Sequence, residues 1–76
     1  MLGDSETIAF LERTFEQEQD PVGVMQSGQL LAMGYVLNEM NRTYEPGMQI
    51  NIALVLTKVQ DKAIELMDIR KKRSSK

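Results

Sequence analysis

Two prolines divide the chain into three stretches, and this division limits the fold more than any other feature of the sequence. Pro21 follows Asp20, and Pro46 stands in the run Glu45-Pro46-Gly47, which is a clear turn signal. A proline lacks the backbone N–H and disfavours helical geometry at the residue before it, so no helix is expected to cross either position. The pair Asp20-Pro21 also suits a helix start, with Asp20 as the cap and Pro21 in the first turn.

The first stretch is predicted to form a helix over residues 4–19. Ile8, Leu11 and Phe15 recur at the spacing that places them on one face of a helix. Asp4 stands ahead of them and is a residue type that caps helix N-termini. The glutamates of this stretch lie largely off the apolar stripe, which indicates a side that faces solvent.

The second stretch is predicted to form a helix over residues 21–43 that is apolar on more than one side. One stripe has the alternating three- and four-residue spacing of a helix-packing seam and comprises Leu30, Met33, Leu37, Met40 and Tyr44. Other apolar residues cover the neighbouring faces. A helix that is apolar on most sides is normally buried. We therefore expect this helix to be central, or its extra face to be covered by another chain.

The third stretch is predicted to form a helix over residues 48–72. Its apolar residues recur at heptad-like spacing and include Ile52, Val55, Val59, Leu66 and Ile69. Residues 49–56 also alternate in part and are rich in β-branched side chains, so a strand is the alternative there. We favour the helix because the helical period continues to Ile69.

The three stretches together predict an all-α protein, a three-helix bundle that self-association would help to complete. We expect one helical domain over residues 1–72 and a frayed basic tail over residues 73–76, since chain ends are poorly ordered unless something docks them. A chain of 76 residues buries a small share of its surface, so a monomer is expected to be marginally stable. The residues expected to be buried in the core are Leu31, Leu37, Val59 and Leu66.

The composition lacks most of the groups on which enzymes rely. The chain has no histidine, cysteine or tryptophan, which excludes thiolate nucleophiles, imidazole bases and zinc sites built on Cys or His. It contains no glycine-rich phosphate loop. Asp61, Glu65 and Asp68 lie among the lysines Lys58 and Lys62, a pattern typical of a solvated charged face. We expect no enzymatic activity, no catalytic residue, no cofactor and no metal site.

Four residues of the second stretch are candidates for contact with a protein partner or with another copy of the chain. Gly28 and Ala32 are small and would let a second helix approach closely, with ordinary core packing as the alternative. Met33 and Met40 share one stripe, and thioether side chains suit adaptable binding grooves. For these methionines the alternative is that they fill gaps in the core.

Charge is separated along the chain. Residues 1–20 carry six acidic side chains against one arginine, and residues 70–76 carry five basic side chains, so the two ends can attract each other within or between chains. Candidates for non-specific binding of nucleic acid or another polyanion are Arg70, Lys71, Lys72 and Arg73. The alternative is that these cations complement the dipole at the end of a helix. We favour the alternative because no aromatic residue stands beside them.

The chain is expected to be cytoplasmic. It can form no disulfide, and its first residues are acidic where a signal peptide is basic. Its longest nearly apolar stretch, Leu30 to Leu37, is far shorter than the roughly 20 residues of a membrane-spanning helix. The sequence therefore predicts a small non-enzymatic helical protein that acts through protein–protein contacts, as an adaptor, regulator or assembly subunit. The alternative is a polyanion binder that uses the C-terminal tail.

Overall fold

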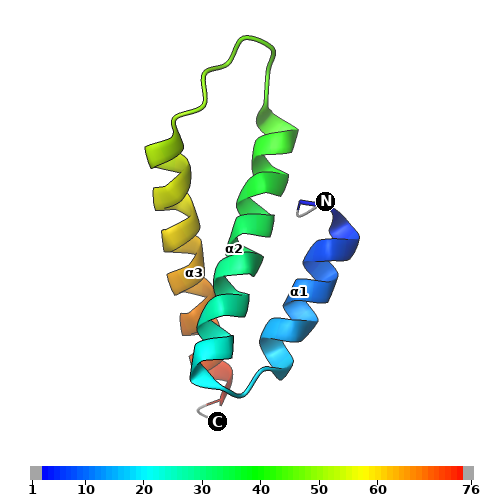
Figure 1. Ribbon diagram of the computed structural model, residues 1–76, viewed down its shortest axis with the longest axis vertical. Helices are drawn as coiled ribbons and strands as arrows, with labels where there is room; N and C mark the ends of the chain where they lie inside the picture. The colour runs from blue at the N-terminus through cyan, green and yellow to red at the C-terminus, as the bar shows by residue number, and fades with distance from the viewer. Residues whose placement is uncertain (1–2, 75–76) are drawn as a thin grey trace.

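The computed structural model describes residues 3–74 and, within that range, the side chains up to Arg73. This part of the chain forms three α-helices and no strand: α1 spans Ser5–Gln17, α2 spans Pro21–Thr43 and α3 spans Ile52–Ser74. The helices run up and down beside one another (Figure 1). The predicted all-α three-helix bundle is confirmed.

The helix α2 is the centre of the molecule, because α1 and α3 each pack chiefly against α2. The shape is elongated, with principal extents of 46, 24 and 20 Å. In Figure 1 the hairpin of α2 and α3 extends beyond the shorter α1. One end of the hairpin is therefore without cover from the third helix.

The Glu18 side chain organises the turn between α1 and α2. Its Oε1 accepts hydrogen bonds from the backbone N–H groups of Gln19 and Asp20, each at 3.1 Å. The carboxylate lies against Gly23 in the first turn of α2, where a Cβ would stand 2.5 Å from Glu18 Cδ. A glycine permits this close approach, and the positive end of the helix dipole favours a negative charge there. The helix begins at Pro21, as predicted.

The loop between α2 and α3 turns at Pro46 and Gly47. Gly47 has a φ of +88°, in the left-handed region that favours glycine. The Met48 N–H donates to the Glu45 carbonyl oxygen across the turn at 3.0 Å. A proline followed by a glycine of positive φ is typical of a type II turn. The second predicted break is thus a tight turn, as expected.

Helix α3 begins at Ile52 rather than at Met48, because Asn51 caps it. The Asn51 Oδ1 accepts a hydrogen bond from the Leu54 N–H at 3.2 Å, and the Asn51 carbonyl accepts one from the Val55 N–H at 3.0 Å. The predicted helix is therefore confirmed from Ile52 onward, and the strand alternative is wrong.

The ends of α1 and α3 differ from the prediction by a few residues. Helix α1 ends at Gln17, since Glu18 has an extended backbone. Helix α3 continues through Arg73 to Ser74, two residues past its predicted end at residue 72. A contact with α1 holds Arg73 there, since its guanidinium lies 2.7 Å from the Glu16 carboxylate. The remainder of the predicted tail, residues 75–76, lies outside the described residues.

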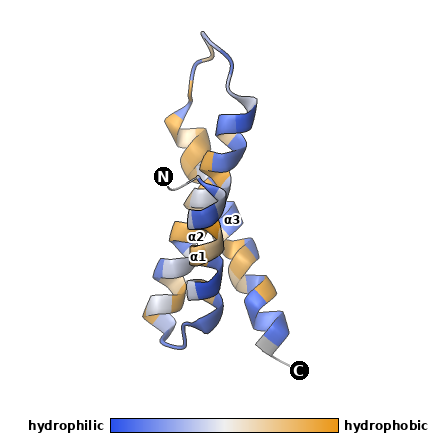
Figure 2. Ribbon diagram, turned by 90° about the vertical axis from the view of Figure 1, so that its right-hand side faces the viewer, coloured by the Kyte–Doolittle hydropathy of each residue, from blue (hydrophilic) through white to orange (hydrophobic). Residues whose placement is uncertain are grey.

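The core forms where α1 crosses α2. Ile8, Leu11 and Phe15 of α1 are buried together with Leu31 of α2. Gly28 lies directly beneath Phe15, since a Cβ there would stand 3.0 Å from the ring carbon Cε1. Apolar residues that pack around this cluster are Val24, Tyr35, Leu66 and Met67. Figure 2, in which the ribbon is coloured by hydropathy, shows apolar positions spread along the length of the bundle.

The prediction of a buried core residue is correct for Leu31, but it overestimates the burial of the other three residues. Leu31 is buried, whereas Leu37, Val59 and Leu66 are half-buried. Leu66 packs against the α1–α2 cluster, whereas Val59 is not among the residues that pack against it. Helix α1 packs chiefly against α2 and adds little cover to α3. Periodicity indicates which residues of a helix share an apolar face, but not whether another helix covers that face.

Candidate interaction surfaces

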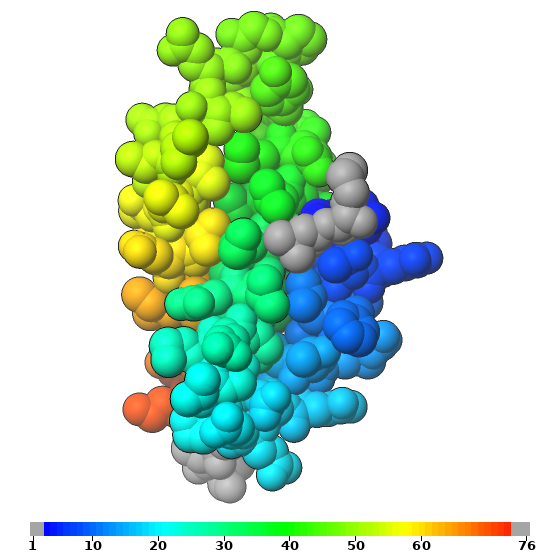
Figure 3. Space-filling view, viewed as in Figure 1, coloured from blue at the N-terminus to red at the C-terminus, as the bar shows by residue number. Residues whose placement is uncertain are grey.

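The stripe Leu30, Met33, Leu37, Met40 and Tyr44, which we call the α2 seam, lies on the open side of α2. Leu30 is 45% exposed, Met33 39% and Tyr44 51%, and the other two are half-buried. Residues on both sides of the seam are buried, namely Ser27, Gly34, Ala32 and Val36. Figure 3 shows the face on which α2 runs between α3 and α1. The α2 seam is therefore apolar surface that α1 and α3 leave uncovered.

A second group of exposed apolar side chains lies around the end of the hairpin, and we call this group the hairpin end. It is made of the exposed side chains of Met48, Ile50, Ile52, Leu54 and Leu56. Ile52 is the most exposed of them, at 71%. Between Tyr44 and Thr57 the chain has one charged residue, Glu45. Depletion of charge together with exposed apolar side chains is typical of the centre of a protein–protein interface.

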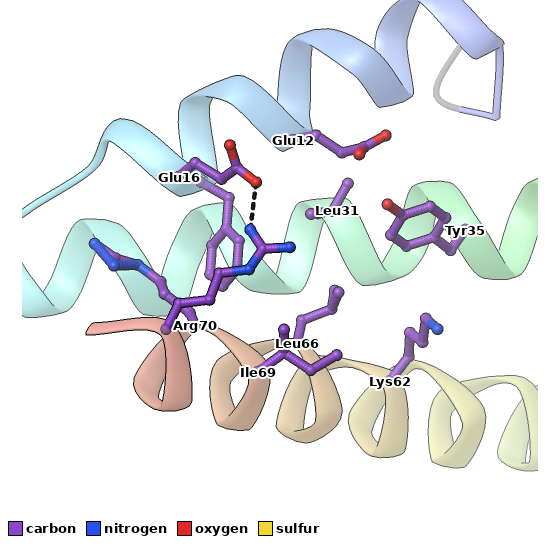
Figure 4. Close-up of a pocket in the computed structure, with 10 residues that line it drawn as sticks. Glu12, Glu16, Leu31, Tyr35, Lys62, Leu66, Ile69 and Arg70 are labelled. Carbon is purple, nitrogen blue, oxygen red and sulfur yellow. Dashed lines mark hydrogen bonds and ion pairs between the residues drawn. The ribbon is translucent and has the colours of Figure 1, made fainter. Parts of the chain in front are cut away.

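A groove of about 550 Å³ runs between α1 and α3 over α2. Its apolar lining comes from Phe15, Leu31, Leu66 and Ile69. Figure 4 shows Glu12 and Glu16 on the α1 side of the groove, with Lys62 and Arg70 on the α3 side. The charges on the two walls are opposite, so the groove has an acidic edge and a basic edge around an apolar floor.

Tyr35 stands in this groove on α2. Partial burial raises the pKa of the Tyr35 hydroxyl above its usual value of 10.0, and the Glu12 carboxylate, which accepts a hydrogen bond from it, raises the pKa further. The Glu16 charge acts in the same direction. On the other side, the Lys62 ammonium lies 5.2 Å from the centre of the tyrosine ring. A phenol held in its neutral form in this way is suited to positioning, not to proton abstraction at neutral pH.

The basic end of α3 is used largely within the chain. The Arg70 guanidinium donates to the Glu18 carbonyl oxygen and lies 5.8 Å from the centre of the Phe15 ring. Arg73 pairs with Glu16 as described, and the Lys72 ammonium lies 3.4 Å from the Asp68 carboxylate. The attraction expected between the acidic and basic ends thus occurs within one chain. Of the four residues predicted to bind polyanions, Lys71, Lys72 and Arg73 are exposed and Arg70 is half-buried.

The four predicted partner-binding residues occupy two different environments. Met33 and Met40 belong to the α2 seam. Gly28 and Ala32 are buried inside the chain, and the room at Gly28 is taken by Phe15 of α1 and by the Met67 methyl group. Contact of these four residues with a partner stays a prediction. In the folded chain, only the two methionines are accessible for such a contact.

The sequence interpretation overlooked the hairpin end as a surface and Tyr35 with Glu12 as a contact. The scarcity of charge between Tyr44 and Thr57 is a signal that could have indicated the first. No local pattern pairs Tyr35 with Glu12, which come from different helices.

Among residues 3–74, no group of three or more acidic side chains is placed to hold a metal ion. None of the helices in this range is long and apolar enough to span a bilayer. No family model matches the chain, and the searches found no similar curated protein and no similar solved structure.

Proposed function

We propose that this is a small non-enzymatic protein that acts through protein–protein contacts, as an adaptor, regulator or assembly subunit. The observation that carries the proposal is the amount of surface left open. The accessible surface of the chain is 5886 Å². A compact folded monomer of this mass exposes about 4,700 Å². The elongated chain thus exposes about 1,200 Å² more than a compact one, which is above the about 800 Å² that a standard interface covers on one partner.

The chemistry of the open surface supports the same proposal. The α2 seam and the hairpin end are apolar and almost free of charge, whereas exposed apolar patches on monomers are normally small. In the groove, Arg73 of α3 pairs with Glu16 of α1, and Tyr35 donates a hydrogen bond to Glu12 and is less acidic than usual. This is an arrangement for holding helices together rather than for bond-breaking chemistry. A chain without cysteine also fits the predicted cytoplasmic location.

Polyanion binding through the C-terminal tail is the less supported function. Two of the four cations, Arg70 and Arg73, are engaged by α1 and by the turn after it. Lys72 lies 3.4 Å from Asp68, and counter-ion release by Lys71 and Lys72 would give weak and salt-dependent affinity.

Photo-crosslinking in cells tests the proposal. A photoreactive phenylalanine analogue is placed at Met33 or Ile52, on the two apolar surfaces, and at Lys71 as the control position. We expect protein adducts from at least one apolar position and none from Lys71. Adducts with nucleic acid from Lys71, together with no protein adduct from Met33 or Ile52, would overturn the proposal.

A further inference from the structure

The helix α2 carries three apolar faces, and the folded chain covers two of them. One face holds Gly28 and Leu31 against α1, and another holds Ala32 and Val36 in the interior. The third face is the α2 seam, whose three- and four-residue spacing over four turns is the pattern by which one helix packs along another. No segment among residues 3–74 supplies that second helix.

The residues that flank the α2 seam decide what can pack there. In a helix pair with this spacing, the flanking positions are Ser27, Gly34 and Asn41 on one side and Gln29, Val36 and Thr43 on the other. Ser27, Gly34 and Val36 are already buried in the fold, which leaves Gln29, Asn41 and Thr43 at the edges of the seam. None of these residues is charged, and the whole range 21–38 contains no charged side chain. Charges at such positions select a different partner and repel a like one. Without them, two identical faces meet at no electrostatic cost.

We propose that the α2 seam is covered by the α2 seam of a second copy of this chain. The inference rests on the proposed function, because it names the partner for one of the two apolar surfaces. Self-pairing about a two-fold axis buries Leu30 and Met33 against apolar residues of the partner's α2 seam.

The other surfaces of the molecule are less suited to pair with the same surface of a second copy. The outer side of α1 is rich in glutamate, so two copies would place like charges together. The groove between α1 and α3 has its charges paired within the chain. The chain as a whole exposes about 1,200 Å² more than a compact monomer of its mass, compared with the about 800 Å² per partner that a standard interface buries.

Two matched leucine variants test whether two copies associate through the α2 seam. Leu30→Lys places a charge on the α2 seam, and Leu54→Lys places the same charge on the hairpin end, where the leucine has a similar exposure of 53%. Sedimentation equilibrium across a concentration series gives the dissociation constant for each chain. We expect Leu30→Lys to weaken association by a hundredfold or more, since each dimer loses two buried apolar side chains and gains two buried charges. Leu54→Lys should leave association within about threefold of the native chain.

Single cysteine variants provide a milder test, because the native chain has no cysteine. Under mild oxidation, a helix pair in parallel orientation cross-links Met33→Cys, and an antiparallel pair centred on the seam cross-links Leu37→Cys. We expect one of the two to form a disulfide dimer at least about tenfold faster than the control Leu54→Cys. Far-ultraviolet circular dichroism verifies that each variant is helical.

The outcomes separate this inference from the proposed function. A native chain that stays monomeric at high micromolar concentration overturns the second copy as the partner. So does association that survives Leu30→Lys and is lost in Leu54→Lys, since the contact would then lie at the hairpin end. In either case, adducts with a different protein from Met33 or Ile52 would still support protein–protein contact as the function. The absence of any protein adduct would contradict the proposed function too.

Discussion

The Arg73 guanidinium lies 2.7 Å from the Glu16 carboxylate and so joins the last turn of α3 to α1. Both helices otherwise pack chiefly on α2, and this pair spans one end of the groove between them. The two side chains are 68% and 58% exposed, so water and salt screen the attraction. The pair therefore positions α3 relative to α1 more than it stabilises the fold.

A double-mutant cycle with Arg73→Gln and Glu16→Gln measures this contact. We expect a coupling free energy of about 0.2–1 kcal/mol, the range of exposed ion pairs, that falls as salt is added. Urea denaturation of the four chains at low and high ionic strength gives the value. The pair Lys72–Asp68 within α3 serves as the comparison, with about 0.3–0.5 kcal/mol. A coupling that is insensitive to salt would contradict the assignment of an ion pair.

Arg70 and Lys71 are neighbours with the same charge but different surroundings, and they test what the basic end of α3 does. Arg70→Ala removes the hydrogen bond to the Glu18 carbonyl and the contact with the Phe15 ring, so we expect a loss of about 1–3 kcal/mol in the free energy of unfolding. Lys71→Ala should change it by less than about 0.5 kcal/mol. Chemical denaturation compares them. Equal effects would mean that complementing the helix dipole is the whole role of these cations.

Sequence reasoning located the elements whose signals are local. Pro21 marks the first residue of α2 because proline acts on its own backbone and on the residue before it. The start of α3 lies later than predicted because Asn51 caps the helix, although the apolar period begins before it.

Burial and pairing across helices were harder to predict, for a physical reason. Leu37 has the same periodic signal as Leu31, yet one faces the core and the other the open side of α2. The choice depends on which faces α1 and α3 occupy, and no short pattern encodes that. The attraction between the ends of the chain was predicted from their charges, but its geometry, Arg73 with Glu16, needed the fold.

Tyr35 should ionise at a higher pH than a free tyrosine. Burial and the nearby Glu12 and Glu16 carboxylates raise its pKa above 10.0 in the folded chain. The neutral phenol is therefore favoured by folding, and its contribution to stability is full below pH 10 and is lost as pH rises through the folded pKa. Tyrosinate absorbance on a Tyr44→Phe background reports Tyr35 alone. Glu12→Gln should lower the pKa of Tyr35 but leave it above the usual value, because burial, the largest cause, persists.

Alanine substitutions at Leu31 and Leu37 should cost different amounts of unfolding free energy, although both residues were predicted to be buried. Leu31→Ala is expected to cost about 2–5 kcal/mol in the free energy of unfolding, because Leu31 is enclosed by α1 and α3 side chains. Leu37→Ala should cost clearly less in the monomer, since Leu37 is half-buried. Urea denaturation at low protein concentration keeps self-association out of the comparison. A larger loss for Leu37→Ala than for Leu31→Ala would contradict the position of the core.

Gly28 distinguishes a packing role from a partner-binding role. Its missing Cβ makes room for the Phe15 ring, so Gly28→Leu should destabilise the dilute monomer by about 1–3 kcal/mol through overpacking. Gly23→Ala is the control: there the added carbon meets the end of the flexible Glu18 side chain, which can move aside. We expect its effect to stay within about 1 kcal/mol, the helix propensity gained by alanine offsetting the disturbed turn. If Gly28→Leu instead left the monomer's unfolding unchanged and weakened only association, Gly28 would belong to an interface, as its small size first indicated.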